Sequence, residues 1–142
     1  MTRHVVFGTG QIGRLVAERI LAAGIDVTAV NRRGGDVTGA VVIAGDATDP
    51  AFTAAVCADA DAVSFCLNAA SYAHWPEQFP PLQRGVLAGA TAAGARLVVL
   101  DNLYAYGPTS GADLVETRCS HPRSAKAATR AAMTADLLRP TR

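Results

Sequence analysis

The sequence predicts an α/β domain in which a parallel sheet of about five strands is covered by helices on both faces. Short apolar runs alternate with longer helical patterns along the whole chain. The apolar runs are bounded by glycine, proline and small polar residues, as buried parallel strands are. No internal repeat, low-complexity tract or linker interrupts this alternation. The order of elements therefore indicates a three-layer, doubly wound sheet.

The expected strands are runs of branched and small apolar residues that are too short for helices. The first strand ends at Gly8, and the third is followed by a polar turn that leads to Pro50. The five expected strands are residues 5–7, 27–30, 40–44, 62–67 and 96–100.

Four helices are expected between and after these strands. From Gln11 to Ala23 apolar residues recur at helical spacing, and Gly24 is well placed to end the helix. A short helix is expected from about residue 51 to residue 58, and an alanine-rich closing helix over residues 124–138. Between them, a turn with Trp75-Pro76 and Pro80-Pro81 is expected to lead into a helix through Ala93 and Gly94.

Length and charge limit the classes of function. A chain of 142 residues fits one domain, which we place at residues 1–142. Thirteen basic residues against twelve acidic ones give a formal net charge of +1, with no run of like charge. Because a surface that reads phosphate backbones needs a basic excess, nucleic acid is not an expected partner.

Targeting signals and cysteine usage indicate the cytoplasm. The apolar run at residues 5–7 is too short for a signal peptide, and no stretch is long enough to span a bilayer. Cys57, Cys66 and Cys119 are odd in number and widely spaced, which argues against disulfides and a zinc site. We expect free, mostly buried thiols, no metal and no membrane partner.

The most specific motif is Gly-x-Gly-x-x-Gly between the expected first strand and first helix. Its residues are Gly8, Thr9, Gly10, Gln11, Ile12 and Gly13. The first glycine permits a tight turn, the second lets the backbone approach a pyrophosphate, and the third lets helix and strand pack closely. The helix then presents unpaired N–H groups to the phosphates. The motif predicts dinucleotide binding; the alternative is an ordinary tight turn.

The end of the second strand indicates which dinucleotide is bound. NAD sites carry an acidic residue there for the ribose diol, but this chain has Asn31, Arg32 and Arg33, and Asp26 lies before the strand. Two guanidinium groups suit a 2′-phosphate, so we expect NADP(H) to be preferred over NAD(H). The alternative is a solvated surface turn.

Asp46 and Ala47 follow the third strand and are further candidates for the cofactor site. The Asp46 carboxylate is placed either to accept a hydrogen bond from the adenine amino group or to cap the helix that begins at Pro50.

Two segments resemble a known family. Residues 97–108, which read Leu-Val-Val-Leu-Asp-Asn-Leu-Tyr-Ala-Tyr-Gly-Pro, resemble the fifth-strand segment of the NAD-dependent epimerase/dehydratase family, the extended and atypical short-chain dehydrogenase/reductases. Members typically show Ser-Ser-x-x-Val-Tyr-Gly there. Residues 65–70 resemble the family's fourth-strand turn. The resemblance runs from Val5 to about Leu138, and it implies a Rossmann sheet that binds NAD(P)(H) with Leu67, Asn68 and Ala69 against the cofactor.

The resemblance also implies candidate catalytic residues. The family uses a Ser or Thr, a Tyr, and a Lys four residues after the Tyr. Asn102 occupies the Ser/Thr position, and Lys126, the chain's only lysine, fits the Lys, which would also hold the ribose hydroxyls. Pro122 stands at the Tyr position and has no acidic proton. Tyr104 or Tyr106 could donate a proton instead; the alternative is that both are packing residues.

These departures, together with a glycine motif one residue shorter than in extended members, indicate an atypical subgroup. The family normally continues through a further strand and a substrate-binding region, whereas this sequence ends at residues 137–142. We therefore expect a truncated sheet whose fifth strand is unpaired at its outer edge, and self-association.

Two functions remain open. One is an NADP(H)-preferring, oxidoreductase-type domain with impaired catalysis, and the other is a non-catalytic NAD(P)(H) sensor that signals through a partner.

Overall fold

The structure, a computed structural model, describes residues 2–139. Residue 1 and residues 140–142 lie outside this range, including most of the terminal segment 137–142 discussed from the sequence. Within it, five parallel strands form one sheet in the order β3-β2-β1-β4-β5. The strands are β1 (Arg3–Phe7), β2 (Asp26–Asn31), β3 (Val41–Ala44), β4 (Ala62–Phe65) and β5 (Arg96–Val99).

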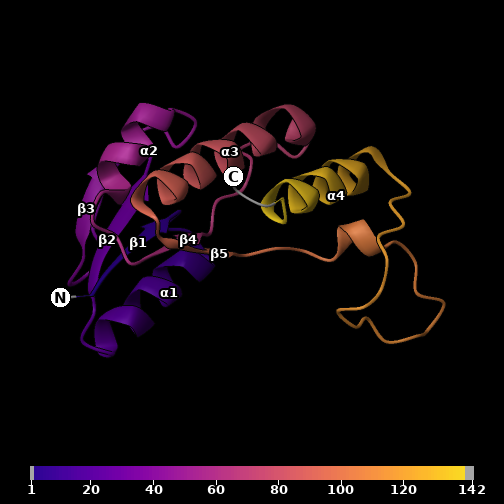
Figure 1. The fold of residues 1–142 in the computed structure, drawn as a ribbon, viewed down its shortest axis with the longest axis horizontal. Helices are drawn as coiled ribbons and strands as arrows, with labels where there is room; N and C mark the ends of the chain where they lie inside the picture. The colour runs from indigo at the N-terminus through magenta and orange to yellow at the C-terminus, as the bar shows by residue number, and fades with distance from the viewer. Residues whose placement is uncertain (1, 140–142) are drawn as a thin grey trace.

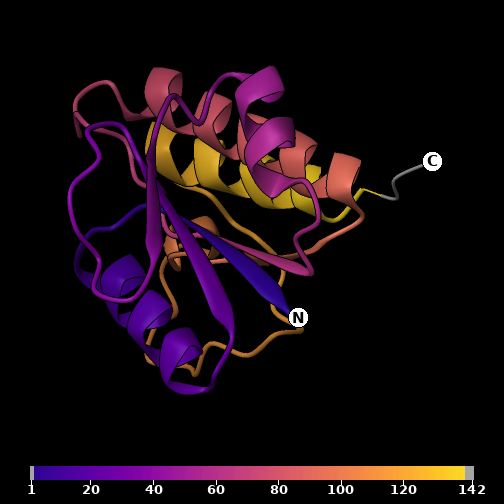
Figure 2. The same cartoon turned by 90° about the vertical axis from the view of Figure 1, so that its left-hand side faces the viewer.

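Helices cover both faces of this sheet. They are α1 (Gln11–Ala22), α2 (Pro50–Cys57), α3 (Trp75–Ala93) and α4 (Ala125–Leu137), with a short 3-10 helix η1 (Tyr104–Tyr106) after β5. Figure 1 shows α1 below the sheet and α2, α3 and α4 above it, and the turned view of Figure 2 shows the same three layers. The predicted doubly wound α/β fold is confirmed.

The strand register brings the segments that follow β1, β2 and β4 to one edge of the sheet. Phe7 at the end of β1 is level with Val30 in β2 and with Phe65 in β4. Because the strands are parallel, the glycine motif, residues 31–33 and residues 66–70 all emerge at their carboxyl ends.

The hydrophobic core lies in two clusters, one on each face. The larger cluster packs α2 and α3 on the sheet and includes Phe65, Trp75 and Phe79, all nearly fully buried. The smaller one packs Ala17 of α1 against Val6 and its strand neighbours. The same alternation that places Val6 toward α1 places Phe7 toward α3, as expected for a strand buried on both faces.

The segment that contains Pro76, Pro80 and Pro81 is helical, so the predicted turn there is wrong. α3 begins at Trp75 and contains Pro80 and Pro81 in its interior. Pro76 at the second helical position costs nothing, because its missing N–H would have no partner within the helix. The interior prolines remove helical hydrogen bonds. Burial of Trp75 and Phe79, which lie one turn apart with ring centroids separated by 4.7 Å, compensates for this loss.

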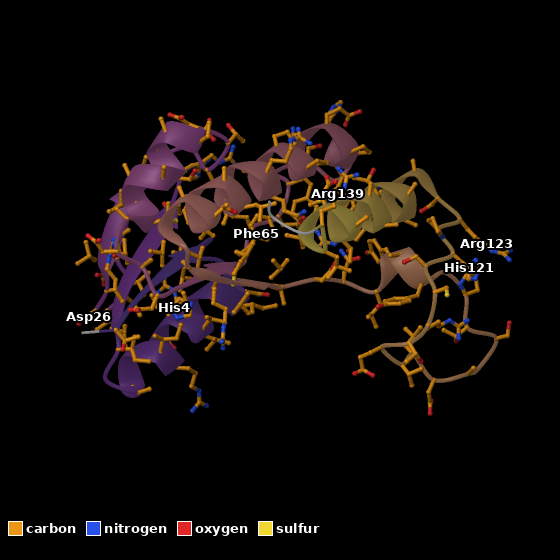
Figure 3. All side chains as sticks on the ribbon, viewed as in Figure 1. His4, Asp26, Phe65, His121, Arg123 and Arg139 are labelled. Carbon is orange, nitrogen blue, oxygen red and sulfur yellow. The ribbon has the colours of Figure 1, made fainter. Side chains whose placement is uncertain are left out.

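The outer edge of β5 is unpaired among the described residues, because this strand pairs with β4 alone. After η1, residues 107–123 run away from the sheet without helix or strand before the chain returns as α4 (Figure 1). His121 N–H donates to the Ala105 carbonyl over 2.9 Å and ties this excursion to η1. Figure 3 shows His121 and Arg123 on it, at the end of the molecule opposite His4 and Asp26.

The three cysteines are unpaired, as expected, but only one is fully buried. Cys57 is buried, Cys66 is half-buried and Cys119 is exposed on the excursion between η1 and α4. Burial raises the pKa of the Cys57 thiol to about 11. The expectation of mostly buried thiols is therefore wrong for Cys119, because residues 107–123 do not pack on the sheet. None of the helices within residues 2–139 is long and apolar enough to cross a bilayer.

Candidate functional site

The glycine turn between β1 and α1 is built so that two of its glycines cannot carry a side chain. Gly8 has φ +96°, and a Cβ there would lie 2.7 Å from the Cys66 carbonyl oxygen. A Cβ on Gly13 would lie 1.8 Å from the Gly8 carbonyl oxygen, so α1 packs directly on the turn. Gly10 differs, because a Cβ there would meet nothing within 4 Å. It precedes the first residue of α1, whose N-terminus has no side-chain cap.

Two hollows open beside this turn and join at Gly10, Cys66, Leu67 and Asn68. The first has a volume of about 900 Å³ and extends past the ends of β2 and β3. The second, of about 400 Å³, extends past the end of β5. Together they form a bipartite cleft at the carboxyl ends of the strands, where open α/β sheets bind ligands.

Most of the cofactor residues expected from the sequence line this cleft. Those in the first hollow are Gly8, Thr9, Gly10, Asn31, Arg32, Arg33, Asp46, Ala47, Leu67 and Asn68. Gln11 and Ile12 line the second hollow. Gly13 lies behind the turn, and Ala69 packs against the larger core cluster instead of lining either hollow.

At the end of β2 the Asn31 side chain connects two loops of the first hollow. Its amide nitrogen donates to the Thr9 hydroxyl over 2.9 Å, and its oxygen accepts the Arg33 N–H over 2.9 Å. Asn31 therefore holds the residues after β2 beside the glycine turn. Arg32 and Arg33 are exposed in the same hollow, whereas Asp26 lies at the far end of β2 (Figure 3).

Asp46 does not cap α2, so that alternative is wrong. The cap is Asp49, whose carboxylate accepts the Ala51 N–H over 2.9 Å, because Asp49 directly precedes the first helical residue. Asp46 instead accepts hydrogen bonds from the N–H and hydroxyl of Thr48. These bonds, first the one from the backbone N–H, lower the pKa of the Asp46 carboxyl. An ionised acceptor thus stands in the first hollow.

At the junction of the hollows, Asn68 is oriented by the chain's single tryptophan. The Asn68 oxygen accepts the Trp75 indole N–H over 2.8 Å and the Ala69 N–H over 2.9 Å. Since an indole N–H only donates, it must face the amide oxygen, and the amide –NH2 of Asn68 remains available to a ligand.

The candidate catalytic residues are only partly brought together. Asn102 lines the second hollow, and its side-chain oxygen accepts the Tyr104 N–H over 3.1 Å. Lys126 lines neither hollow; its ammonium nitrogen lies 3.2 Å from the centre of the Tyr72 ring. The Tyr72 and Tyr104 hydroxyl oxygens are 3.1 Å apart. Tyr106, half-buried in η1, also lines neither hollow.

Tyr72 was not among the candidates from the sequence. It lies in the aromatic turn after β4, 32 positions before Tyr104, and no local pattern links the two residues. The one usable signal is the coincidence of an aromatic turn after β4 and a second one after β5, two neighbouring strands of the sheet.

Below the second hollow, a buried ion pair fixes α4. Arg130 is fully buried and pairs with the carboxylate of Asp101, which lines the hollow, and the Thr134 hydroxyl donates to the same carboxylate over 3.1 Å. Within residues 2–139, no cluster of three or more His, Cys, Asp or Glu side chains is close enough to hold a metal ion.

A glycine turn at the N-terminus of α1, joined to a bipartite cleft at the strand ends, defines a dinucleotide-binding domain of the Rossmann type. The chain belongs to the NAD(P)H-binding family, whose profile matches residues 8–139. No curated protein matches the sequence.

Solved structures of similar proteins share the fold over nearly the whole chain. A Burkholderia cenocepacia J2315 protein described provisionally as an epimerase is 27% identical, with a TM-score of 0.81, over 96% of this chain and 50% of its own. The UDP-glucose 4-epimerase of Brucella ovis, solved with NAD, is 16% identical with a TM-score of 0.84 over 96% of this chain and 47% of its own. The uronate dehydrogenase of Agrobacterium tumefaciens is 18% identical with a TM-score of 0.77 over 94% of this chain and 53% of its own.

The resemblance to epimerases and short-chain dehydrogenases seen in the sequence is thus confirmed. The chain spans about half the length of the proteins that it matches.

Proposed function

We propose that the protein binds NADP(H) in the bipartite cleft and acts as the cofactor-binding part of an oxidoreductase of the epimerase/dehydratase type. The observation that carries this proposal is the cleft itself. Its two hollows meet at Gly10, the one glycine of the turn whose missing side chain leaves open space. A dinucleotide has the same shape, with two nucleosides joined at a pyrophosphate.

The residues present fit each part of the cofactor. The pyrophosphate would lie against Gly10 and the uncapped N-terminus of α1, with the Thr9, Gln11 and Ile12 backbone around it. Asp46 and Ala47 would contact the adenine in the first hollow, and Asn68 would donate its amide N–H at the junction. The nicotinamide would occupy the second hollow beside Asn102. When bound, it supplies hydride transfer to or from a substrate.

The preference for NADP(H) is supported by charge. Arg32 and Arg33 line the first hollow from the loop after β2, and the Asn31 amide bonds Thr9 and the Arg33 N–H. The Asn31 amide is neutral and lacks the charge of the carboxylate that holds a ribose diol in NAD sites, while Arg32 and Arg33 can each donate forked hydrogen bonds to a 2′-phosphate.

Titration with NADPH and NADH tests the assignment. The single tryptophan, Trp75, is bonded to Asn68 at the junction of the hollows, so its fluorescence should fall as reduced cofactor binds. We expect NADPH to bind at least tenfold more tightly than NADH, and 2′,5′-ADP to compete better than 5′-ADP. No quenching by either cofactor would contradict the proposed function, and equal affinities would contradict the NADP(H) preference alone.

A non-catalytic sensor of NAD(P)(H) is the second candidate, and one observation favours it. Pro122, four residues before Lys126, is exposed on the excursion after η1 and has no proton to give. In this function the bound cofactor reports redox state to a partner. Tight cofactor binding without hydride transfer to any carbonyl compound would favour the sensor over the enzyme.

We also propose that the protein self-associates along the outer edge of β5. Val98 in β5 and Leu100, the residue after the strand, are exposed apolar side chains, at 50% and 42%. Val98 is level with Ser64 in β4, which is level with Val6, so it lies on the face that α1 covers farther along the sheet. An unpaired edge beside apolar surface favours pairing with a second chain.

The three unpaired cysteines agree with a reducing cytoplasm, which we propose as the compartment.

A further inference from the structure

The second hollow differs from the first in the charge of its lining. Among the described residues it is lined by Gly10, Gln11, Ile12, Cys66, Leu67, Asn68, Phe79, Leu100, Asp101 and Asn102. Asp101 is the one carboxylate in this set, which contains no lysine, arginine or histidine. Burial raises the pKa of the Cys66 thiol, so this side chain is neutral. In the first hollow, by contrast, arginines and carboxylates occur together. The second hollow therefore carries a negative charge in otherwise neutral surroundings.

The countercharge of Asp101 is buried behind the hollow. Arg130 pairs with Asp101 Oδ1, but its side chain is fully buried and lines neither hollow, whereas the Asp101 side chain is 34% exposed. Two further bonds fix the carboxylate. The Asn102 N–H donates to Oδ1 over 2.6 Å, and the Thr134 hydroxyl donates to Oδ2 over 3.1 Å. Because a Coulomb interaction weakens with distance, a charge in the hollow would interact with the carboxylate more strongly than with the guanidinium.

The two redox forms of a nicotinamide dinucleotide differ by one charge, which lies on the nicotinamide ring. The oxidised ring is a cation and the reduced ring is neutral, while the adenosine, the pyrophosphate and the 2′-phosphate are the same in both. A carboxylate beside the ring attracts the cation and acts little on the neutral form. The positive N-terminal end of α1 also opens on the cleft, but there it would meet the pyrophosphate, which both forms share.

We propose that Asp101 makes the second hollow selective for the oxidised cofactor, NADP⁺, over NADPH. The inference rests on the proposed function, because it requires the nicotinamide to lie in the second hollow. Asp101 is then the residue that determines specificity for the redox state of the cofactor. Arg130 is a positioning residue, which holds the Asp101 carboxylate in place and offsets part of its charge.

This selectivity bears on both candidate functions. Tenfold tighter binding of the oxidised form lowers the reduction potential of the bound couple by about 30 mV, because the couple exchanges two electrons. In an enzyme, bound NADPH would then donate its hydride more readily. In a sensor, the occupancy of the cleft would follow the ratio of NADP⁺ to NADPH and not only their total concentration.

Calorimetric titration with NADP⁺, NADPH and 2′-phospho-ADP-ribose tests the proposal. The third ligand lacks the nicotinamide and therefore reports on the rest of the cleft alone. We expect the wild-type protein to bind NADP⁺ about fivefold more tightly than NADPH, or more. In Asp101→Asn the amide oxygen can still accept from Arg130 and Thr134. This variant should lose about fivefold or more in affinity for NADP⁺ and less than about twofold for the other two ligands.

Arg130→Gln should shift the preference in the opposite direction. It removes the countercharge and leaves the carboxylate in the hollow, so the preference for NADP⁺ should increase. If the ion pair only held α4 in place, both variants would lose affinity for all three ligands alike. If Asp101→Asn fails to fold, the double variant Asp101→Asn/Arg130→Gln takes its place. It replaces two buried charges by two neutral amides, and it should show the same loss of preference.

Asp46→Asn is the matched control, because it removes a carboxylate from the first hollow. It should change the affinities for NADP⁺ and NADPH by the same factor. An unchanged ratio of the two affinities in Asp101→Asn, or a wild-type protein that binds NADPH as tightly as NADP⁺, would overturn the proposal and leave the proposed function standing. Binding of none of the three ligands would contradict both. Since NAD⁺ and NADH differ by the same charge, they give the same test if the 2′-phosphate preference fails.

Discussion

At the scale of single residues, Gly10 and Gly13 should respond very differently to a methyl group. A Cβ on Gly10 meets open space in the cleft, whereas one on Gly13 would lie 1.8 Å from the Gly8 carbonyl oxygen. We expect Gly10→Ala to fold with a stability within about 1 kcal/mol of the wild-type protein and to bind NADPH at least tenfold more weakly. Gly13→Ala should fail to fold or unfold at much lower urea. Circular dichroism and Trp75 quenching measure the two effects. Normal NADPH binding by Gly10→Ala would show that the pyrophosphate does not lie against Gly10.

Arg32 is expected to discriminate between the two cofactors. A hydrogen bond between charged groups contributes about 1.5–3 kcal/mol, so Arg32→Ala should weaken NADPH binding by roughly tenfold to a hundredfold. NADH lacks the 2′-phosphate, and its affinity should change less than twofold. Arg84→Ala, on α3 and outside both hollows, is the control. Equal losses for NADPH and NADH in Arg32→Ala would show that the arginine does not contact a 2′-phosphate.

His4 should make the folded protein less stable in mild acid. Burial lowers the pKa of His4 below its usual 6.5, and its Nε2 lies 3.0 Å from the Ser64 hydroxyl. The unfolded chain therefore binds more protons as the pH falls through 6.5, and the free energy of unfolding decreases.

Urea unfolding at pH 7 and pH 5 measures this effect. The loss of stability between the two pH values should be smaller in His4→Gln, whose amide can still bond Ser64 but does not titrate. His74 and His121 are present in both proteins, so the difference isolates His4. An equal loss in both proteins would show that His4 is not responsible.

At the scale of elements, strands and helices follow from the sequence wherever local pattern and tertiary packing agree. All five strands and α1, α2 and α4 lie within a few residues of their predicted bounds. The prediction is wrong at the start of α3, because the cost of Pro80 and Pro81 is local and visible in the sequence, while the burial of Trp75 and Phe79 that offsets it is not.

The parts of the candidate site that depend on local sequence can be predicted, and those that depend on tertiary packing cannot. The glycine turn and the loops after β2, β3 and β4 follow from one motif and from the parallel order of the strands. The Tyr72–Tyr104 contact does not, because η1 and the excursion at residues 107–123 set the position of Tyr104 relative to the turn after β4. Asp49 instead of Asp46 caps α2 because the helix begins one residue after Asp49.

The docking of α4 should depend on Asp101 more than on Arg130. Removal of Asp101 leaves a fully buried guanidinium whose Nη2 already has no partner among the described residues. Removal of Arg130 leaves a carboxylate with a side chain that is 34% exposed. We expect Asp101→Ala to lower the free energy of unfolding by about 3 kcal/mol or more, and Arg130→Met to lower it by less. Urea denaturation measures both, and the reverse order would contradict this account of how α4 is held.

At the scale of the whole molecule, the structure combines a cleft at the strand ends with a sheet whose two edge strands, β3 and β5, each have an unpaired outer side within residues 2–139. Each side of the cleft comes from residues that are already packed: α1 behind the glycine turn, α3 behind Asn68, and α4 behind Asp101. The described lining of the bipartite cleft thus comes from packed parts of this chain, whereas the outer edge of β5 has main-chain groups without a partner in residues 2–139. Cofactor binding and self-association should therefore be separable.

Light scattering tests this separation. At micromolar concentration we expect the wild-type protein to have at least twice the mass of one chain. Val98→Lys should be a monomer, because a lysine at a sheet edge opposes pairing with another strand. Val41→Lys is the matched control, since Val41 is an exposed valine on β3, the opposite edge strand, and this variant should associate like the wild-type protein. The affinity for NADPH should be equal in all three. A monomeric wild-type protein, or dissociation by Val41→Lys and not by Val98→Lys, would contradict association through β5.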